Sequence, residues 1–296
     1  MKNMYALGIA LASFTTSSTY AQDFFDAEQL KDPTYGEYEN AADESVDGDP
    51  DIQVLNDELL QYIIEDQTGS YDEQRFLAGD TVMTGAELRK IHSPDRNFSA
   101  EVCSQRRVWP RGVIPYDDSG VGSSDIRSRI ARAAGVWGKY GITWRKRTSR
   151  DTSYVKFQTT AKGCWADIGY AGGRRTINLG NNCYTQAVIL HEMGHTMGLY
   201  HEQVRPDRDN FVIVKMQNVQ RGQEHNFTKQ GCYDSSISYD YRSIMHYSSY
   251  AFAKRPGLKT IVKRDGTTIQ RGSTLTTSDV KTLKRLYSDG FLAGEE

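Results

Sequence analysis

The sequence predicts an α+β domain, from about residue 108 onward, that follows an acidic N-terminal segment. Asp and Glu outnumber Lys and Arg by 21 to 8 in residues 1–107, whereas Lys and Arg outnumber Asp and Glu by 28 to 17 in residues 108–296. This charge asymmetry suggests that the chain has two segments with different roles, which can attract each other. Strand-like and helix-like hydrophobic patterns alternate after Trp109, which predicts a mixed α+β fold.

The strands and first helix of this domain are predicted by local residue patterns. Ser123 is a good N-cap for a helix whose apolar face runs from Ile126 to Trp137. Strands are expected where β-branched and aromatic residues dominate, at residues 112–116, 142–147, 154–159 and 176–179.

Three further elements complete the predicted domain. A helix is expected at about 185–199, and a last helix begins near Thr277, capped by Thr277 or Ser278. A hairpin is predicted over 254–270, because Asp265-Gly266 is a strong turn signal.

The N-terminal segment has the features of an export signal followed by a propeptide. Residues 1–21 combine Lys2, an apolar run and the small-x-small site Thr19-Tyr20-Ala21. We expect the protein to be secreted, into a compartment where its four cysteines can form disulfides. No stretch reaches the ~20 apolar residues that a membrane span needs.

Residues 22–107 form the expected propeptide, and residues 108–296 the expected catalytic domain. Residues 22–66 contain Lys31 as their single basic residue, and this composition predicts poor folding of the early part. The apolar residues between Val54 and Ile64 are spaced to suit a short helix. The boundary lies between 96 and 107, with cleavage after Arg96, Arg106 or Arg107.

The chemistry is concentrated in residues 191–201, His-Glu-Met-Gly-His-Thr-Met-Gly-Leu-Tyr-His. His191 and His195 are four residues apart, so on a helix both imidazoles lie on one face and can hold one Zn²⁺ ion. Gly198 can end the helix at positive φ and bring His201 in as third ligand. Three protein ligands and an open position are typical of a catalytic zinc ion, beside which Glu192 can act as general base.

Two other classes of function are weighed against a peptidase. A zinc-stabilised binding module would not need a base at Glu192. A basic protein that binds extracellular matrix is compatible with the charge of residues 108–296, and also with proteolysis. Nucleic acid is not an expected partner, because Lys and Arg are scattered rather than clustered in one motif.

The signature HEMGHTMGLYHEQVRPDRDNFV resembles that of the astacin family of metzincin zinc endopeptidases. Residues 243–247, Ser-Ile-Met-His-Tyr, resemble the Met-turn of that family, and residues 109–116 resemble the start of its catalytic domains. The resemblance implies a twisted sheet with two long helices above the active-site cleft and an irregular lower subdomain. It also implies hydrolysis of internal bonds in protein or peptide substrates, with matrix proteins among the candidates.

The resemblance assigns roles to four further positions. Met245 would form the floor beneath the histidines, and Tyr247 would be a metal ligand that swings away to stabilise the oxyanion. Glu202 would bind the new N-terminus after maturation. Cys164 and Cys183 would form a disulfide.

Two residues compete for the role of latency ligand, through which the propeptide would inhibit its own enzyme. Astacin propeptides carry an Asp in a Phe-x-Gly-Asp motif, and residues 76–80 (Phe-Leu-Ala-Gly-Asp) contain one extra residue before Asp80. Cys103 precedes the catalytic domain, and a thiolate is a strong zinc ligand. We expect Cys103 to be the ligand, with Asp80 as the alternative and a Cys103–Cys232 disulfide as a third possibility.

Overall fold

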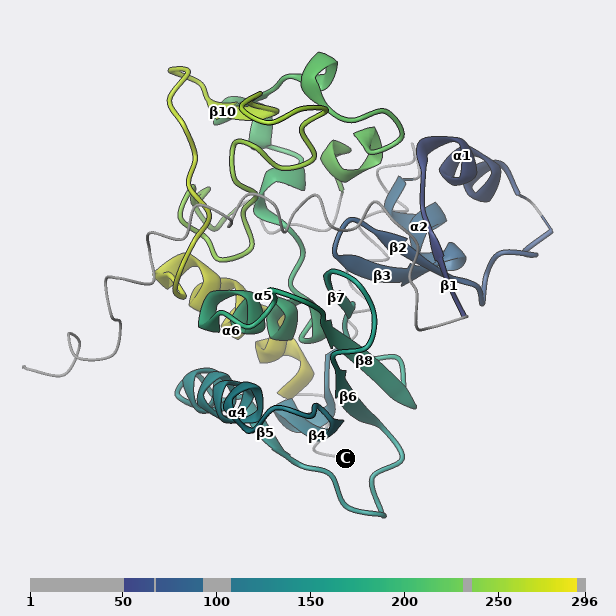
Figure 1. Ribbon diagram of the computed structural model, residues 1–296, viewed down its shortest axis with the longest axis vertical. Coiled ribbons are helices and arrows are strands. Elements are labelled where there is room, and N and C mark those ends of the chain that lie inside the picture. The colour runs from purple at the N-terminus through teal and green to yellow at the C-terminus, as the bar shows by residue number, and fades with distance from the viewer. Residues whose placement is uncertain (1–50, 67, 93–107, 231–235, 292–296) are drawn as a thin grey trace, which may run out of the picture. The chain divides into compact units, whose positions relative to one another are not determined.

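The computed structural model describes residues 51–66, 68–92, 108–230 and 236–291 (Figure 1). The predicted signal at residues 1–21 lies outside these ranges, as do Cys103 and Cys232. None of the described helices is long and apolar enough to cross a membrane.

An eight-stranded mixed sheet, in the order β1-β2-β3-β7-β8-β6-β4-β5, organises the described residues. Its strands are β1 (Ile52–Val54), β2 (Arg75–Ala78), β3 (Thr81–Thr84), β4 (Val113–Gly120), β5 (Thr143–Lys146), β6 (Tyr154–Gln158), β7 (Cys164–Asp167) and β8 (Arg174–Leu179). The four strands predicted from residue patterns correspond to β4, β5, β6 and β8, and β7 was not predicted.

Two long helices pack against each other and against this sheet (Figure 1). Helix α4 (Ser124–Gly138) is capped as predicted, since the side chain of Ser123 accepts a hydrogen bond from the Ile126 N–H. Helix α5 (Gln186–Thr196) is capped by Thr185 and is buried from Ala187 to its end. Such a helix has no solvent face, so it forms the centre of the domain.

The C-terminal helix α6 (Thr277–Phe291) supports the end of α5. The Tyr287 hydroxyl donates a hydrogen bond to the Met197 carbonyl, and the indole N–H of Trp109 donates one to the Thr196 carbonyl. The helix cap is Thr276, whose hydroxyl accepts the Asp279 N–H, and not Thr277 or Ser278 as predicted.

The chain beyond α5 is irregular. It forms the 3₁₀ turns η5 (Glu202–Val204), η6 (Arg208–Asn210), η7 (Met216–Asn218) and η8 (Glu224–Phe227), with another turn, η4 (Pro110–Gly112), before β4. The hairpin predicted over 254–270 is wrong in its pairing, because β10 (Ile261–Lys263) pairs antiparallel with the distant β9 (Val212–Val214). The turn at Asp265-Gly266 is present, with Gly266 at φ +83°.

Residues 51–92 fold as a small α/β unit, which goes beyond the short helix predicted there. Helix α1 (Asp57–Glu65) begins at Asn56, whose side chain accepts the Leu59 N–H, and helix α2 (Gly85–His92) packs against it. Strand β3 pairs parallel with β7, in the register Thr81 with Ala166 and Val82 with Asp167. The N-terminal segment therefore extends the sheet of the domain that follows it.

Candidate active site

The candidate site is built on the last turns of α5. The Gly198 N–H bonds to the His195 carbonyl and the Leu199 N–H to the Gly194 carbonyl, which is a Schellman end. Gly198 has φ +98°, a backbone conformation that favours glycine. The predicted role of Gly198 is therefore found, since the chain turns away there and returns as His201.

The imidazoles of His191, His195 and His201 converge at one point. Nε2 of His195 lies 3.0 Å from Nε2 of His191 and 3.1 Å from Nε2 of His201. Nitrogens at these separations can bind a single zinc ion at ~2.0–2.1 Å each.

The other nitrogens of two rings determine which atoms face the ion. Nδ1 of His191 lies 2.6 Å from the Ile244 carbonyl, and Nδ1 of His195 lies 2.8 Å from the Leu199 carbonyl. Carbonyls only accept hydrogen bonds, so Nδ1 carries the proton and Nε2 presents a lone pair. Burial, with Arg271 adding to it, lowers the pKa of His191 from 6.5 to about 3, which favours this neutral form.

Glu192 is fully buried beside the histidines. Neither of its carboxylate oxygens has a hydrogen-bond partner among the described residues. Burial raises the pKa of its carboxyl well above the usual range, and the charge of Asp80 adds to this. A buried carboxylate without a hydrogen-bond partner lowers the stability of the folded protein. Such groups are typically found where the carboxylate takes part in chemistry.

Met245 lies directly beneath the histidine helix. A Cβ built on Gly194 would lie only 2.8 Å from Met245 Sδ, so the sulfur packs against the helix backbone between His191 and His195. The contact explains the glycine at position 194 and puts Met245 at the place expected for the floor of the site.

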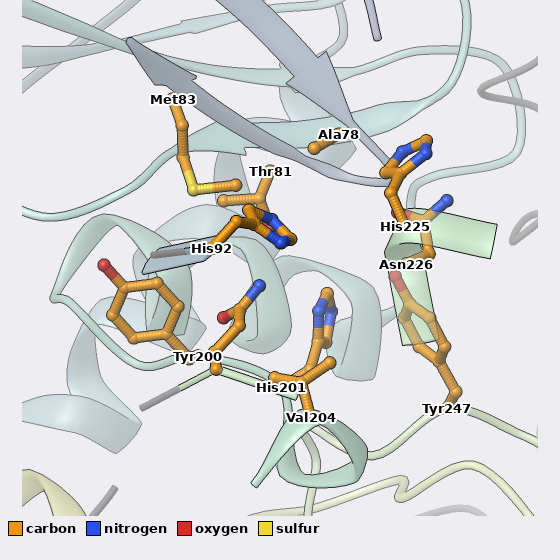
Figure 2. A pocket seen from close by; sticks show the side chains of 11 residues that line it. Ala78, Thr81, Met83, His92, Tyr200, His201, Val204, His225, Asn226 and Tyr247 are labelled. Atoms are coloured by element: carbon orange, nitrogen blue, oxygen red, sulfur yellow. The ribbon is translucent and has the colours of Figure 1, made fainter. Parts of the chain in front are cut away.

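Tyr247 borders the site on the side of His201, where both residues line a pocket (Figure 2). The ring centroids of Tyr247 and His201 are 4.4 Å apart. The backbone N–H of Tyr247 donates to the buried side chain of Gln203, at 3.1 Å. Sequence reasoning did not identify Gln203, because no motif links it to Tyr247.

Asp80 approaches all three histidines from the N-terminal segment. Its carboxylate oxygens lie 3.1 Å from Nε2 of His191, 3.1 Å from Nε2 of His201 and 3.6 Å from Nε2 of His195. The extra residue in the Phe-Leu-Ala-Gly-Asp segment is accommodated because Gly79, at φ +66°, turns the chain between β2 and β3.

The remaining assigned residues lie close to the site. One oxygen of Glu202 accepts hydrogen bonds from Arg205, at 3.0 Å, and from the Asp240 N–H, at 2.8 Å. Burial raises the pKa of Glu202 to about 7, although Arg205 opposes this. The disulfide expected between Cys164 and Cys183 is present.

A second contact of the N-terminal segment was not foreseen. Asp57, in the first turn of α1, accepts hydrogen bonds from both the backbone N–H and Nδ1 of His225, each at 2.9 Å. His225 lies in η8 and also lines the pocket of Figure 2. No local pattern could have indicated this pair, because 168 residues separate its members.

The fold and the site can now be set beside known proteins. The family model described as Astacin (Peptidase family M12A) matches residues 101–288. Bone morphogenetic protein 1 of Xenopus laevis is 35% identical over 213 residues, which cover 69% of this chain and 30% of that protein. Zinc metalloproteinase nas-15 of Caenorhabditis elegans is 33% identical over 236 residues, covering 76% of this chain and 41% of that protein.

Among solved structures, the hatching enzyme zinc-protease high choriolytic enzyme 1 of Oryzias latipes superposes with a TM-score of 0.57. The two chains are 27% identical, and the match covers 62% of this chain and 96% of the other.

The chain is therefore a zinc metallopeptidase by class, and it belongs to the astacin family. Peptidases of this family use one catalytic zinc ion. The three Nε2 lone pairs and the adjacent unpartnered carboxylate of Glu192 fit that ion. The matched regions span 30% and 41% of the length of these two curated relatives.

Proposed function

We propose that this protein is a secreted endopeptidase, made as a precursor whose N-terminal segment blocks the zinc site. The observation that carries the proposal is the convergence of three imidazole Nε2 atoms beside Glu192. A structural zinc site would have a closed shell of four ligands and no need of a buried base.

His191, His195 and His201 would hold the ion, which when bound polarises the substrate carbonyl and lowers the pKa of water. Glu192 takes a proton from the attacking water and gives it to the nitrogen of the leaving amine, so the peptide bond breaks with no net change in protons. Tyr247, after turning from its present position, donates a hydrogen bond to the oxyanion. Met245 supports the helix that carries the two first ligands.

We assign latency to Asp80. It faces Nε2 of all three ligands, so it occupies the position that water and substrate need. The pairing of β3 with β7 supports this assignment, because it holds the backbone that follows Asp80: the Ala166 N–H donates to the Asp80 carbonyl at 2.9 Å. Cys103 remains the alternative ligand.

Maturation would separate residues 22–107 from the catalytic domain 108–296. Cleavage after Arg96, Arg106 or Arg107 would free a new N-terminus. Glu202 is buried, and one of its two carboxylate oxygens accepts the hydrogen bonds from Arg205 and Asp240, which supports its role as a partner for that amine.

Secretion is supported by the Cys164–Cys183 disulfide, since such bonds persist in oxidising compartments. The export signal expected at residues 1–21 agrees with it. The substrates would be extracellular proteins or peptides, with matrix proteins as candidates because residues 108–296 are basic.

The test is digestion of casein or gelatin by the chain after limited cleavage of its N-terminal segment. Activity should be lost with a chelator and restored by one equivalent of Zn²⁺. Cleavage that a chelator does not affect, or no cleavage by zinc-loaded protein, would contradict the proposal.

A further inference from the structure

The residue before Asp80 occupies the cleft itself. Asp80 lies on the three histidines, so Gly79 is one residue away from the position where a substrate bond must be placed for hydrolysis. A Cβ built on Gly79 would lie 2.7 Å from Asn226 Oδ1 and 2.8 Å from Tyr247 Oη. Both distances are shorter than carbon–oxygen contact allows, so this part of the cleft has no room for a side chain.

The position of Asn226 is fixed by its neighbours. Its Nδ2 donates to the backbone carbonyl of Gln223, at 3.3 Å, and to Gln223 Oε1, at 2.8 Å. Because both amide hydrogens are directed to Gln223, the oxygen faces Gly79. Asn226 is 7% exposed and belongs to the short turn η8, so it has little freedom to move aside.

Asn226 differs from Tyr247 in its freedom to move away from the position of Gly79. In the proposed mechanism Tyr247 turns to reach the oxyanion, which removes its hydroxyl from beside Gly79. The carboxamide of Asn226 stays, held by Gln223. After the N-terminal segment leaves, Asn226 still borders the space that Gly79 had filled. Asn226 and Tyr247 both line the pocket of Figure 2.

We propose that Asn226 is a specificity-determining residue, which restricts the substrate residue that takes the place of Gly79 to glycine. The preferred substrates are then proteins with a glycine beside the scissile bond. This proposal rests on the proposed function, because it assigns a selectivity to the same cleft.

The sequence Asn226-Phe227-Thr228 also matches a glycosylation sequon. In the folded protein this site is not available, because Nδ2 is buried and makes two hydrogen bonds. The structure thus favours a role for Asn226 inside the cleft over one as a glycan carrier.

The test compares cleavage of peptides that carry Gly, Ala, Leu or Phe at each position flanking the scissile bond. The processed wild type should favour Gly over Leu at one position by about tenfold or more in kcat/KM, which is the effect of a few methylenes that do not fit. Asn226→Ala should lower that ratio at least about fivefold, at that position alone. Asn218→Ala is the matched control, since its side-chain amide donates to the Lys259 carbonyl and Asn218 is not among the residues that line the pocket of Figure 2.

A binding measurement separates this inference from the proposed function. The same peptides are titrated into zinc-loaded Glu192→Gln protein, with and without Asn226→Ala, and affinity is read by fluorescence anisotropy. The Gly-over-Leu preference should appear in binding and weaken without Asn226. Asn226→Ser replaces Asn226→Ala if thermal unfolding shows that the latter has lost its fold.

Equal cleavage and binding of Gly and Leu peptides at every flanking position of the wild type would overturn the inference, and so would an unchanged preference in both Asn226 variants. Chelator-sensitive cleavage in those same assays would leave the proposed function standing. Loss of cleavage in the wild type, with the binding preference intact, would remove the proposed function and keep Asn226 as a selectivity residue.

Discussion

At the residue scale, the side chains of the site lie close together but have different roles, since the histidines would bind zinc and Glu192 would act as the base. His191 and His195 are held by carbonyls that fix their tautomers, whereas the carboxylate oxygens of Glu192 have no hydrogen-bond partner among the described residues. Removing a histidine would therefore remove the metal, whereas changing Glu192 should leave the metal in place. This difference separates binding from catalysis in the first prediction.

Glu192→Gln should retain one zinc per chain and lose activity by about 10²–10⁴-fold, because the amide has nearly the same shape but cannot take a proton. Zinc content is measured by atomic emission and kcat/KM with a fluorogenic peptide. Asp125→Asn is the control, since that carboxylate is exposed on α4 and pairs with Arg129. Retention of a third of wild-type activity would remove Glu192 as the base.

Tyr247→Phe removes one oxygen and keeps a ring that packs near His201, Phe227 and Phe252. We expect unchanged zinc content, a KM close to that of the wild type and a kcat lower by about 10²–10³-fold, the usual effect of losing one oxyanion donor. Steady-state kinetics on the processed enzyme give both constants. An unchanged kcat would exclude Tyr247 from the reaction.

Latency distinguishes Asp80 from Cys103. The uncleaved Asp80→Ala precursor should leak peptidase activity, because its side chain no longer covers Nε2 of the ligands, whereas Cys103→Ser should stay latent. Activity of each precursor is assayed before cleavage, and free thiols are counted in the denatured wild type. A leak from Cys103→Ser alone would transfer the role to Cys103, and the same leak from Cys232→Ser would indicate a Cys103–Cys232 disulfide.

At the element scale, the turn η8 is the place where the N-terminal segment and the enzyme part meet twice. Asp57 of α1 holds His225, and Gly79 lies against Asn226. A turn of four residues thus takes part both in anchoring the segment and in shaping the cleft. Docking of α1 should therefore contribute to latency, although α1 contacts His225 and not the three zinc-binding histidines.

Asp57→Ala removes the acceptor of two hydrogen bonds to His225. Hydrogen bonds to a charged group contribute about 1.5–3 kcal/mol each, so the cleaved segment should leave the enzyme at least about tenfold faster. Its release is followed by the onset of activity after cleavage. Glu58→Ala, at an exposed position in the same turn of α1, should release the segment at the wild-type rate.

The parts of the fold that the sequence predicts are those with a local cause. The spacing of Ile126, Ile130 and Trp137 determines helix α4, and the i, i+4 histidines with Gly198 determine the zinc-binding turn. Hydrophobic alternation likewise marks β6. These features need no knowledge of distant residues.

The parts that it does not predict depend on distant partners. Strand β10 pairs with β9, about 50 residues earlier in the chain, and β3 pairs with β7 across the boundary between the two segments. The extra residue before Asp80 argues against it as the latency ligand when the sequence is compared with the family motif. In the structure the chain turns at Gly79, and the Asp80 carboxylate lies beside the zinc-binding histidines. No sequence motif marks Asn226, because its proposed role depends on its contact with Gly79, which is distant in the sequence.

At the scale of the whole molecule, the latency proposed above would depend on the balance between docking and release of residues 51–92. This segment brings a titratable group of its own, His92, to the pocket beside His201. Burial lowers the pKa of His92 from 6.5 to about 4, with the charge of neighbouring His225 adding to the effect and that of Asp57 opposing it. Docking of the segment therefore favours the neutral form of His92.

Docking should therefore weaken in acid. The contribution of His92 is fully present above pH 6.5 and is lost as pH falls from 6.5 towards 4, since the undocked segment binds the extra proton more readily. Dissociation of the cleaved segment is measured from pH 7.5 to pH 5 by anisotropy of a labelled segment. His92→Gln should flatten the profile over this range, and an identical profile in that variant would exclude His92.

The shared sheet has one more consequence, which concerns solubility. Strand β7 would be an edge strand without β3. The N–H groups of Ala166 in β7 and of Ile168 just after it now bond to the carbonyls of Asp80 and Val82. Bare edges are templates on which other chains stack, and proteins normally shield them. In the proposed precursor, the N-terminal segment would shield this edge until it is released. Its release would then leave free backbone groups along β7, which an extended polypeptide could cover whether it is a substrate or another molecule of the same protein.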